Sequence, residues 1–265
     1  MNRQLNISLV QADLSSDIKK NISLFNKLLK PIRDTDIILL PEMFNTSFLP
    51  EETNLSETMN GRTINWMQGI ARKRSCSISG TLMIKEKGHI YNRLVWISNN
   101  GDLFSYDKRH LFSLAKENKF LNKGSKRLIV EHNGWKICPL ICYDLRFPVF
   151  SRNNIDYDIL IYLSNWPQKR IEAWNTLLRA RSIENQCYTI GVNRVGKDKK
   201  GVVFNGFSQV FDCFGKQLVC INNKEQVETI VLDKDYIELN KAKFNFLQDM
   251  DDFTKLKDEE QHFIK

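Results

Sequence analysis

Three polar residues that follow strand-like segments of the sequence can act together in catalysis: the acid Glu42, the amine Lys108 and the thiol Cys142. A thiol is a weak nucleophile at its free pKa of about 8.5, so it must lose its proton to attack a carbonyl carbon. Glu42 can take that proton, and the ammonium of Lys108 favours the thiolate. Lys108 and the backbone N–H of Tyr143 can donate to the oxygen that becomes negative. These groups predict acyl transfer without a histidine or a metal ion.

Each of these side chains is expected at the end of a strand. Four aliphatic residues at 37–40 predict a buried strand, which Pro41 ends just before the glutamate. An alternating stretch at 103–107, after an Asn-Asn-Gly turn, ends at the lysine, and a strand over 135–141 runs directly into the cysteine. Functional side chains of α/β proteins lie at the carboxyl ends of strands and in the loops that follow. We therefore expect these strands to position the catalytic groups.

Along the whole chain, strand-like and helix-like segments alternate, which predicts the α/β class. The length of 265 residues and the lack of a linker favour one domain over residues 1–240. Helices are expected over 17–29, 63–73 and 171–185. Strands are expected over 5–11, 37–40, 77–83, 91–97, 103–107, 128–131, 135–141, 159–163, 188–192, 207–211, 217–221 and 227–232.

Three motifs in a fixed order resemble those of the carbon–nitrogen hydrolases of the nitrilase superfamily. They are Leu40-Pro41-Glu42, the segment from Tyr106 to Phe112, and the segment from Cys142 to Pro148. The resemblance extends from Leu5 to about Leu239. It implies a four-layer α-β-β-α sandwich and amide hydrolysis through a thioester, with no cofactor and no metal.

Two further segments, Leu163–Pro167 and Arg179–Gln186, look similar to the ω-amidase branch of that family. The resemblance implies hydrolysis of the terminal amide of a 2-oxo acid amide, 2-oxoglutaramate or 2-oxosuccinamate, to the dicarboxylate and ammonia. The same motifs leave other substrates open, namely a nitrile, an N-carbamoyl compound or another small amide. A non-catalytic binding or scaffold protein is an alternative of a different class, and the complete acid, amine and thiol argue against it.

Four more residues are candidates for the site. Glu117 matches a second acid that the family places near its lysine, although it also fits a solvated position in a charge-rich loop. Arg146 can clamp a substrate carboxylate, but a structural pair with Asp144 or another acid is favoured. Phe48 and Trp166 follow catalytic-side strands and are expected to form walls of the pocket, unless they are plain core aromatics.

Composition excludes several classes of function. The net charge of +8 comes from dispersed basic residues without a nucleic-acid-binding motif, so nucleic acid is not an expected partner. The short charged run at 197–200, between two glycines, is expected to be an exposed loop. The six cysteines form no C-x-x-C pair, which argues against a disulfide framework and a zinc site. Without a signal sequence or a long apolar span, we expect a cytoplasmic protein that does not bind membranes and acts on a small molecule.

The segment 241–265 carries Phe244, Phe246, Leu247 and Phe253 among acidic residues, too many apolar side chains for a free solvated end. It is expected to pack on the core or across the interface of a homodimer or higher homo-oligomer.

Overall fold

The computed structural model describes residues 3–251, and its strands confirm the twelve expected from the sequence and add two. The strands are β1 (Gln4–Gln11), β2 (Ile37–Leu39), β3 (Ser77–Glu86), β4 (His89–Ile97), β5 (Leu103–Asp107), β6 (Val130–His132), β7 (Trp135–Ile141), β8 (Ile159–Leu163), β9 (Tyr188–Val192), β10 (Val195–Lys197), β11 (Val203–Asn205), β12 (Ser208–Phe211), β13 (Gln217–Ile221) and β14 (Gln226–Asp233). The additional pair, β10 and β11, forms a hairpin where only an exposed loop was expected around 197–200.

The helices include all three that were predicted. They are α1 (Ile18–Leu29), α2 (Arg62–Arg74), α3 (Glu117–Phe120), α4 (Pro148–Ser151), α5 (Ile171–Glu184) and α6 (Lys234–Lys243). Short 3₁₀ helices lie at η1 (Thr53–Leu55), η2 (Ser113–Ala115), η3 (Cys142–Arg146), η4 (Gln168–Arg170) and η5 (Phe246–Asp249). The start of α1 follows from its sequence, because the Asp17 carboxylate accepts from the first free backbone N–H groups of the helix.

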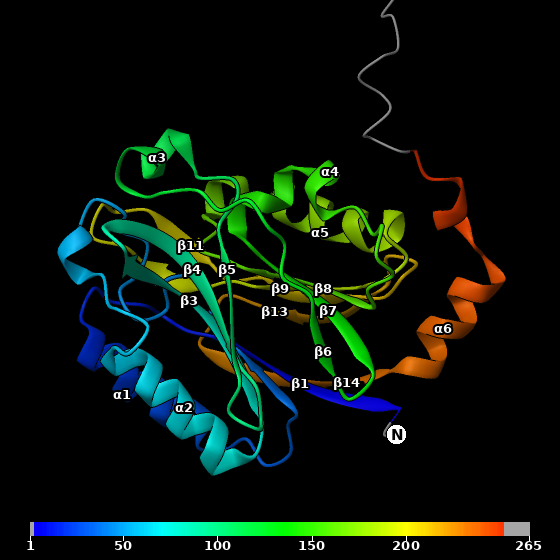
Figure 1. The fold of residues 1–265 in the computed structure, drawn as a ribbon, viewed down its shortest axis with the longest axis horizontal. Coiled ribbons are helices and arrows are strands. Elements are labelled where there is room, and N and C mark those ends of the chain that lie inside the picture. Colours follow the sequence, from blue (N-terminus) through cyan, green and yellow to red (C-terminus); the bar gives the residue numbers. More distant parts are fainter. Residues whose placement is uncertain (1–2, 252–265) are drawn as a thin grey trace, which may run out of the picture.

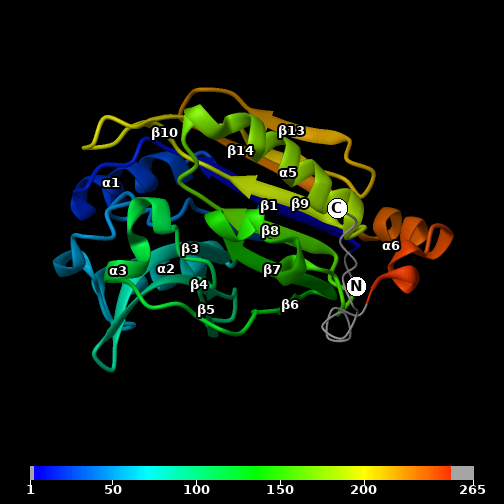
Figure 2. The same ribbon diagram turned by 90° about the horizontal axis from the view of Figure 1, so that it is seen from above.

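Two six-stranded sheets lie face to face, with helices on both outer faces (Figure 1). The first sheet has the order β14-β1-β2-β3-β4-β5 and the second β13-β12-β9-β8-β7-β6. Helices α1 and α2 cover the first sheet, and α5 covers the second, as the view turned by 90° also indicates (Figure 2). This arrangement confirms the α-β-β-α sandwich. The first sheet contains both an early and a late part of the chain, because β1 pairs antiparallel with β14 from Gln4↔Asp233 to Gln11↔Gln226.

The aliphatic run of β2 is explained by burial on both faces of its sheet. Side chains alternate along a strand, so Ile37 and Leu39 point into the core between the two sheets. Ile38 points the other way and packs in the core beneath α1 and α2. Because the strand is covered on both sides, its end fixes the position of the next residues closely.

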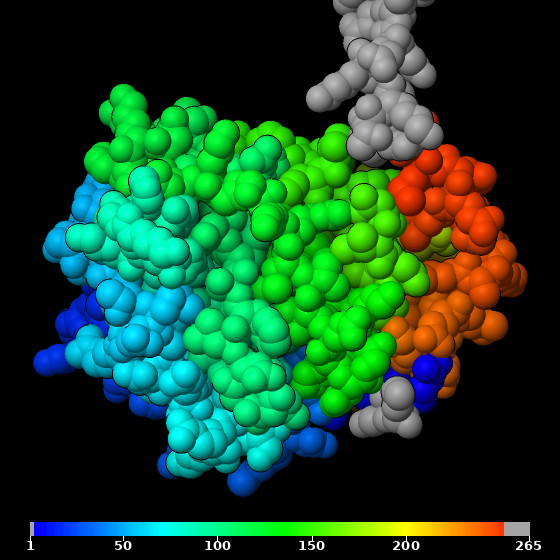
Figure 3. All heavy atoms as spheres, viewed as in Figure 1, coloured from blue at the N-terminus to red at the C-terminus, as the bar shows by residue number. Residues whose placement is uncertain are grey.

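The described part of the C-terminal segment, up to residue 251, packs against the body of the protein (Figure 3). The Nζ atom of Lys241 donates to the side chain of Asp156 at 2.8 Å, and the ring of Phe244 packs edge-on against that of Phe214. Phe253 lies outside the described residues. No helix within residues 3–251 combines the length and apolarity needed to cross a membrane.

Candidate active site

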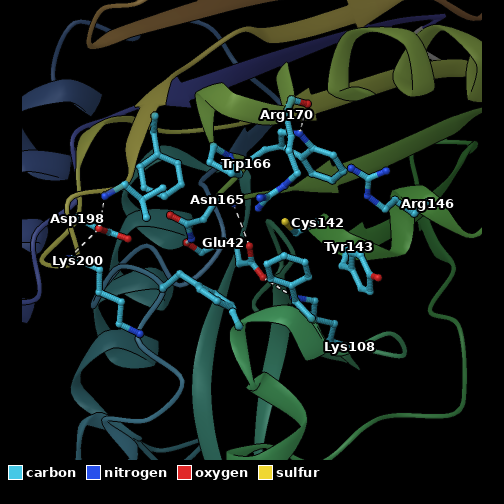
Figure 4. A pocket seen from close by; sticks show the side chains of 16 residues that line it. Glu42, Lys108, Cys142, Tyr143, Arg146, Asn165, Trp166, Arg170, Asp198 and Lys200 are labelled. Carbon is cyan, nitrogen blue, oxygen red and sulfur yellow. Dashed lines mark hydrogen bonds and ion pairs between the residues drawn. The ribbon is translucent and has the colours of Figure 1, made fainter. Parts of the chain in front are cut away.

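The acid, the amine and the thiol meet in one pocket between the two sheets (Figure 4). Glu42 follows β2 and Lys108 follows β5, both in the first sheet, whereas Cys142 follows β7 in the second. Glu42 and Lys108 are completely buried, and Nζ of Lys108 lies 2.7 Å from Oε1 of Glu42. The site is therefore complete only when the two sheets are packed together.

Two asparagines hold the carboxylate of Glu42 in place. Asn92, on β4, donates from Nδ2 to Oε1 of Glu42 at 2.8 Å. The backbone N–H of Asn165, just after β8, donates to Oε2 at 2.9 Å, and its side chain donates to the backbone oxygen of Glu42 at 2.6 Å. Both carboxylate oxygens are thus fixed by donors from different strands, which orients the acid toward the thiol.

Glu117, the first residue of α3, is the second carboxylate beside Lys108. It is completely buried, and its Oε2 and Oε1 atoms lie 3.0 and 3.2 Å from Nζ of Lys108. Asn92 donates to Glu117 at 3.0 Å and the backbone N–H of Phe112 at 2.6 Å. A solvated position for Glu117 is therefore wrong, because its charge is neutralised by partners inside the protein.

The charges of this cluster follow from burial and from mutual attraction. Burial alone would lower the pKa of Lys108, but the negative charges of Glu117 and Glu42 outweigh it and raise that pKa above its usual value. Burial raises the pKa of Glu117, and the attraction of Lys108 opposes this. Lys108 is thus an ammonium ion at neutral pH, held between two acids.

The backbone at Cys142 is strained. Its φ angle is +41°, in the left-handed region that favours glycine, at the junction where β7 turns into η3. Such strain in a non-glycine residue is found at functional sites, where the surrounding structure holds it in place. The turn also puts Tyr143 in the first turn of η3, where a backbone N–H has no partner within the helix.

The thiol of Cys142 is protonated in the resting protein. Burial raises its pKa, as do the negative charge of Glu42 and a hydrogen bond from the thiol to that carboxylate. The positive charge of Lys108 lowers the pKa by less, so the net shift is upward. The expectation that Lys108 favours the thiolate describes a real attraction, but burial and Glu42 outweigh it. Proton transfer to Glu42 must therefore accompany any attack by the sulfur.

Asp144 joins the segment that carries the cysteine to the segment that carries the lysine. It accepts from the backbone N–H of Ile141 at 3.0 Å and from the hydroxyl of Tyr106 at 2.7 Å. The backbone N–H and Nδ1 of His110 lie 3.0 and 2.8 Å from its other oxygen. These groups occupy the carboxylate, and Arg146 forms no ion pair with Asp144 or with another acid within residues 3–251, so the favoured structural pair is not found.

The pocket has aromatic walls and a volume of about 120 Å³. The ring of Phe48 lies 5.4 Å from Nζ of Lys108, and the guanidinium of Arg146 lies over the ring of Trp166 at 5.0 Å. All the site residues expected from the sequence except Glu117 line this pocket. The lining is Glu42, Phe48, Lys108, Phe112, Ala115, Cys142, Tyr143, Arg146, Asn165, Trp166, Pro167, Arg170, Asp198, Lys200, Val202 and Phe204.

Sequence reasoning missed several of these residues. Asn92 carries a weak signal, a small polar side chain beside Arg93 in a strand that continues with the apolar residues 94–97. Asn165 lies in a segment that the family resemblance had marked, but no role had been assigned to it. Arg170 and the hairpin residues Asp198 and Lys200 carried no signal of their own.

The hairpin of β10 and β11 lies at the mouth of the pocket. Lys199 and Lys200, at its tip, pair with Glu52 and Glu51 at 3.1 and 2.5 Å. These ion pairs are exposed, and exposed pairs contribute little to stability and weaken with added salt. The tip of the hairpin is therefore held by weak contacts.

Comparisons with known proteins agree with this geometry. The family model for carbon-nitrogen hydrolases matches residues 3–241. The chain is 38% identical over 252 residues to Omega-amidase YafV of Escherichia coli strain K12, covering 94% of this chain and 98% of that protein. It is 31% identical to the 2-oxoglutaramate amidase of Bacillus subtilis strain 168, covering 86% and 90% of the two chains. The solved structure of XC1258 from Xanthomonas campestris, a CN-hydrolase superfamily protein with an arsenic adduct in its active site, is similar with a TM-score of 0.92 and 38% identity, covering 94% and 98%. The likeness therefore extends over both sheets.

Proposed function

This chain belongs to the carbon–nitrogen hydrolase family, and from that premise we propose that it hydrolyses the terminal amide of a small 2-oxo acid amide, 2-oxoglutaramate or 2-oxosuccinamate. The products are the dicarboxylate and ammonia. The enzyme class follows from the family match over nearly the whole chain and from relatives above 30% identity that bear amidase names. The choice of substrate is supported by the names of those relatives and by the chemistry of the pocket.

In the first half-reaction Cys142 attacks the amide carbon while its proton passes to Glu42. The negative oxygen that forms receives hydrogen bonds from Nζ of Lys108 and from the backbone N–H of Tyr143. The tetrahedral intermediate then collapses, the carbon–nitrogen bond breaks, and Glu42 returns the proton to the leaving nitrogen, which departs as ammonia. The acyl group remains on the sulfur as a thioester.

In the second half-reaction a water molecule gives a proton to Glu42 and attacks the thioester carbon. The same two donors stabilise the negative oxygen, the carbon–sulfur bond breaks, and the sulfur takes the proton back from Glu42. One carboxylate thus carries every proton of the cycle, so no step calls for a cofactor. Glu117 acts on Lys108 and not on the substrate, because it keeps the ammonium charged and oriented.

The observation that carries this proposal is the set of contacts around Glu42. The acid lies 2.7 Å from the ammonium of Lys108 and accepts a hydrogen bond from the thiol of Cys142, which burial keeps protonated. A protonated thiol must lose its proton when the sulfur attacks. The adjacent carboxylate of Glu42 accepts that proton. Arg146, which has a guanidinium over Trp166 in the same pocket, supplies a cation for the carboxylate of the substrate.

The test is ammonia release by the purified protein from 2-oxoglutaramate, with glutamine, a simple nitrile and an N-carbamoyl amino acid measured in parallel. Cys142→Ala serves as the control for turnover at this site. We expect activity on the 2-oxo acid amide that exceeds the activity on the other three and is lost in the variant.

Other outcomes would contradict the proposal in different ways. Preferred turnover of the nitrile or the carbamoyl compound would keep the hydrolase chemistry and discard the substrate. Turnover that persists in Cys142→Ala would refute the assignment of the nucleophile. A folded protein without activity on any of the four would favour a non-catalytic role or another small amide.

A further inference from the structure

Two guanidinium groups in the pocket have no carboxylate partner within residues 3–251: those of Arg146 and Arg170. The other pocket cations are paired, since Lys108 lies between two carboxylates and Lys200 pairs with Glu51. A guanidinium has five N–H donors and no acceptor. Two guanidinium groups without a carboxylate partner in one cavity therefore favour the binding of an anion there.

Both guanidinium groups are held in place before any ligand binds. That of Arg146 lies over the ring of Trp166 at 5.0 Å, and that of Arg170 lies over the ring of Phe112 at 5.1 Å. The indole N–H of Trp166 donates to the backbone oxygen of Arg170 at 2.7 Å, which ties the base of one arginine to the ring beneath the other. Fixed planar donors lose little entropy when they bind a carboxylate.

The surroundings of Arg170 disfavour its positive charge as long as no anion is bound. Burial lowers the pKa of this guanidinium, and the positive charge of Arg146 lowers it further, whereas Cys142 acts in the opposite direction. In the view of Figure 4, the side chain of Arg170 reaches toward Cys142 from the side opposite Lys108. An anionic group bound here would relieve the repulsion between the two arginines while it lies within a short substrate's length of the thiol.

We propose that Arg170 is a specificity-determining residue, which binds the substrate carboxylate together with Arg146 and rejects amides that carry an ammonium group beside that carboxylate. This inference rests on the proposed amide hydrolysis. The 2-oxo oxygen of a 2-oxo acid amide is uncharged and accepts a guanidinium N–H. The ammonium group of an amino acid amide has only donors, and it would face two cations.

Besides Glu42, the acidic side chain in the pocket lining is Asp198, which lies on the hairpin of β10 and β11. Its Oδ1 atom accepts from the backbone N–H groups of Lys200 and Val202, both at 2.9 Å. In Figure 4 it also lies on the far side of Glu42 from Arg146 and Arg170. The end of the pocket that holds Arg146 and Arg170 is therefore cationic, and it is the end proposed to bind the substrate carboxylate.

The test compares Arg170→Met and Arg170→Lys with the wild type on 2-oxoglutaramate, glutamine and uncharged butyramide. Lys169→Met is the matched control, because Lys169 is the exposed neighbour in η4 and does not line the pocket. For Arg170→Met we expect the ratio of kcat/KM between 2-oxoglutaramate and butyramide to fall by about 100-fold, mostly through KM, as charge-assisted hydrogen bonds are lost. The preference over glutamine should fall with it, and lysine should restore part of both ratios. The control should keep the wild-type ratios.

Equal losses on all three amides, or unchanged ratios in a folded variant, would overturn the inference. A binding measurement separates this failure from failure of the proposed function. In a Cys142→Ala background, calorimetry with the product 2-oxoglutarate should show at least about 10-fold weaker binding when Arg170→Met is added. Equal Kd values would overturn the role of Arg170 whichever amide the wild type hydrolyses. A wild type that leaves 2-oxoglutaramate intact while this difference persists would refute the substrate and keep the anion site.

Discussion

Replacement of Glu117 by glutamine tests whether the buried second acid holds the ammonium of Lys108 for catalysis. The substitution keeps the size of the side chain and removes its charge. Of the two carboxylates around Lys108, only Glu42 would remain, at 2.7 Å. The new amide would also present N–H donors to Lys108 or to Asn92, which are themselves donors.

The expected size of the effect follows from the contact distances. Two unit charges 3.0 Å apart attract by about 5 to 6 kcal/mol at an effective dielectric constant of about 20. Part of this is recovered, because a neutral amide costs less to bury than a carboxylate. Removing one partner of a buried pair costs about 3–5 kcal/mol. Since Glu42 still pairs with Lys108, we expect about 3 kcal/mol of unfolding free energy to be lost.

Catalysis should suffer on a similar scale. Without Glu117, Lys108 pairs with Glu42 alone, so the acid becomes a poorer acceptor for the thiol proton and the ammonium is displaced from the oxyanion. We expect kcat/KM for amide hydrolysis to fall by about 100-fold or more. Because domains have about 5–15 kcal/mol of stability, the variant should still be folded at 25 °C.

The assay measures ammonia release at pH 7.5 and chemical denaturation on the same preparation. Glu117→Asp is the companion variant, since it keeps the charge but shortens the reach, and it should recover stability more than rate. A folded Glu117→Gln protein with wild-type kcat/KM would refute the reasoning that this carboxylate supports Lys108 in the reaction.

Three further predictions follow from the charges and contacts of the structure. Burial raises the pKa of Glu117, so this carboxyl should take up a proton above the usual 4.5, and kcat/KM should fall on the acid side from that higher pH. On the alkaline side, the raised pKa of Lys108 should cause no loss below its usual 10.5, and a pH–rate profile measures both limits. In Glu42→Gln both half-reactions should slow by about 1,000-fold, while the pKa of Cys142 should fall because a neighbouring negative charge is gone; pH-dependent alkylation by iodoacetamide measures this, and an unchanged or higher pKa would contradict it. Removal of residues 241–265 should lower the melting temperature or dissociate a homo-oligomer, because a lysine in this segment binds the loop before β8; unchanged size and melting, measured by light scattering and calorimetry, would count against any structural role.

The parts of the site that sequence reasoning located are those that depend on local pattern. The buried run of β2 and the proline after it predict where Glu42 must lie, and the strand before Cys142 does the same for the thiol. Their joint position needed the family resemblance, because spacing along the chain does not say which strand ends meet. The strands before Glu42 and Lys108 belong to one sheet, and the strand before Cys142 belongs to the other.

The parts that sequence reasoning missed depend on partners far away in the chain. Asn92 bridges two acids that lie 50 and 25 residues away from it, and nothing in its own neighbourhood indicates this. The positive φ angle of Cys142 has no sequence signal, because glycine is the residue that such a turn favours. The charged run at 197–200 correctly indicated exposure. Its position over the pocket depends on the direction in which the chain continues from β9 into β10, which the sequence does not indicate.

The pairing of β1 with β14 has a consequence for folding during synthesis of the protein. These strands join positions such as Gln4 and Asp233, so the first sheet lacks its edge until nearly the whole described chain has been synthesised. Pairing between such distant segments closes a long loop and is slow to form. During translation β1 emerges first, and the edge that pairs with β14 stays unpaired until β14 has been synthesised. The growing chain is then open to aggregation, and a chaperone that shields this edge would raise the yield of folded protein.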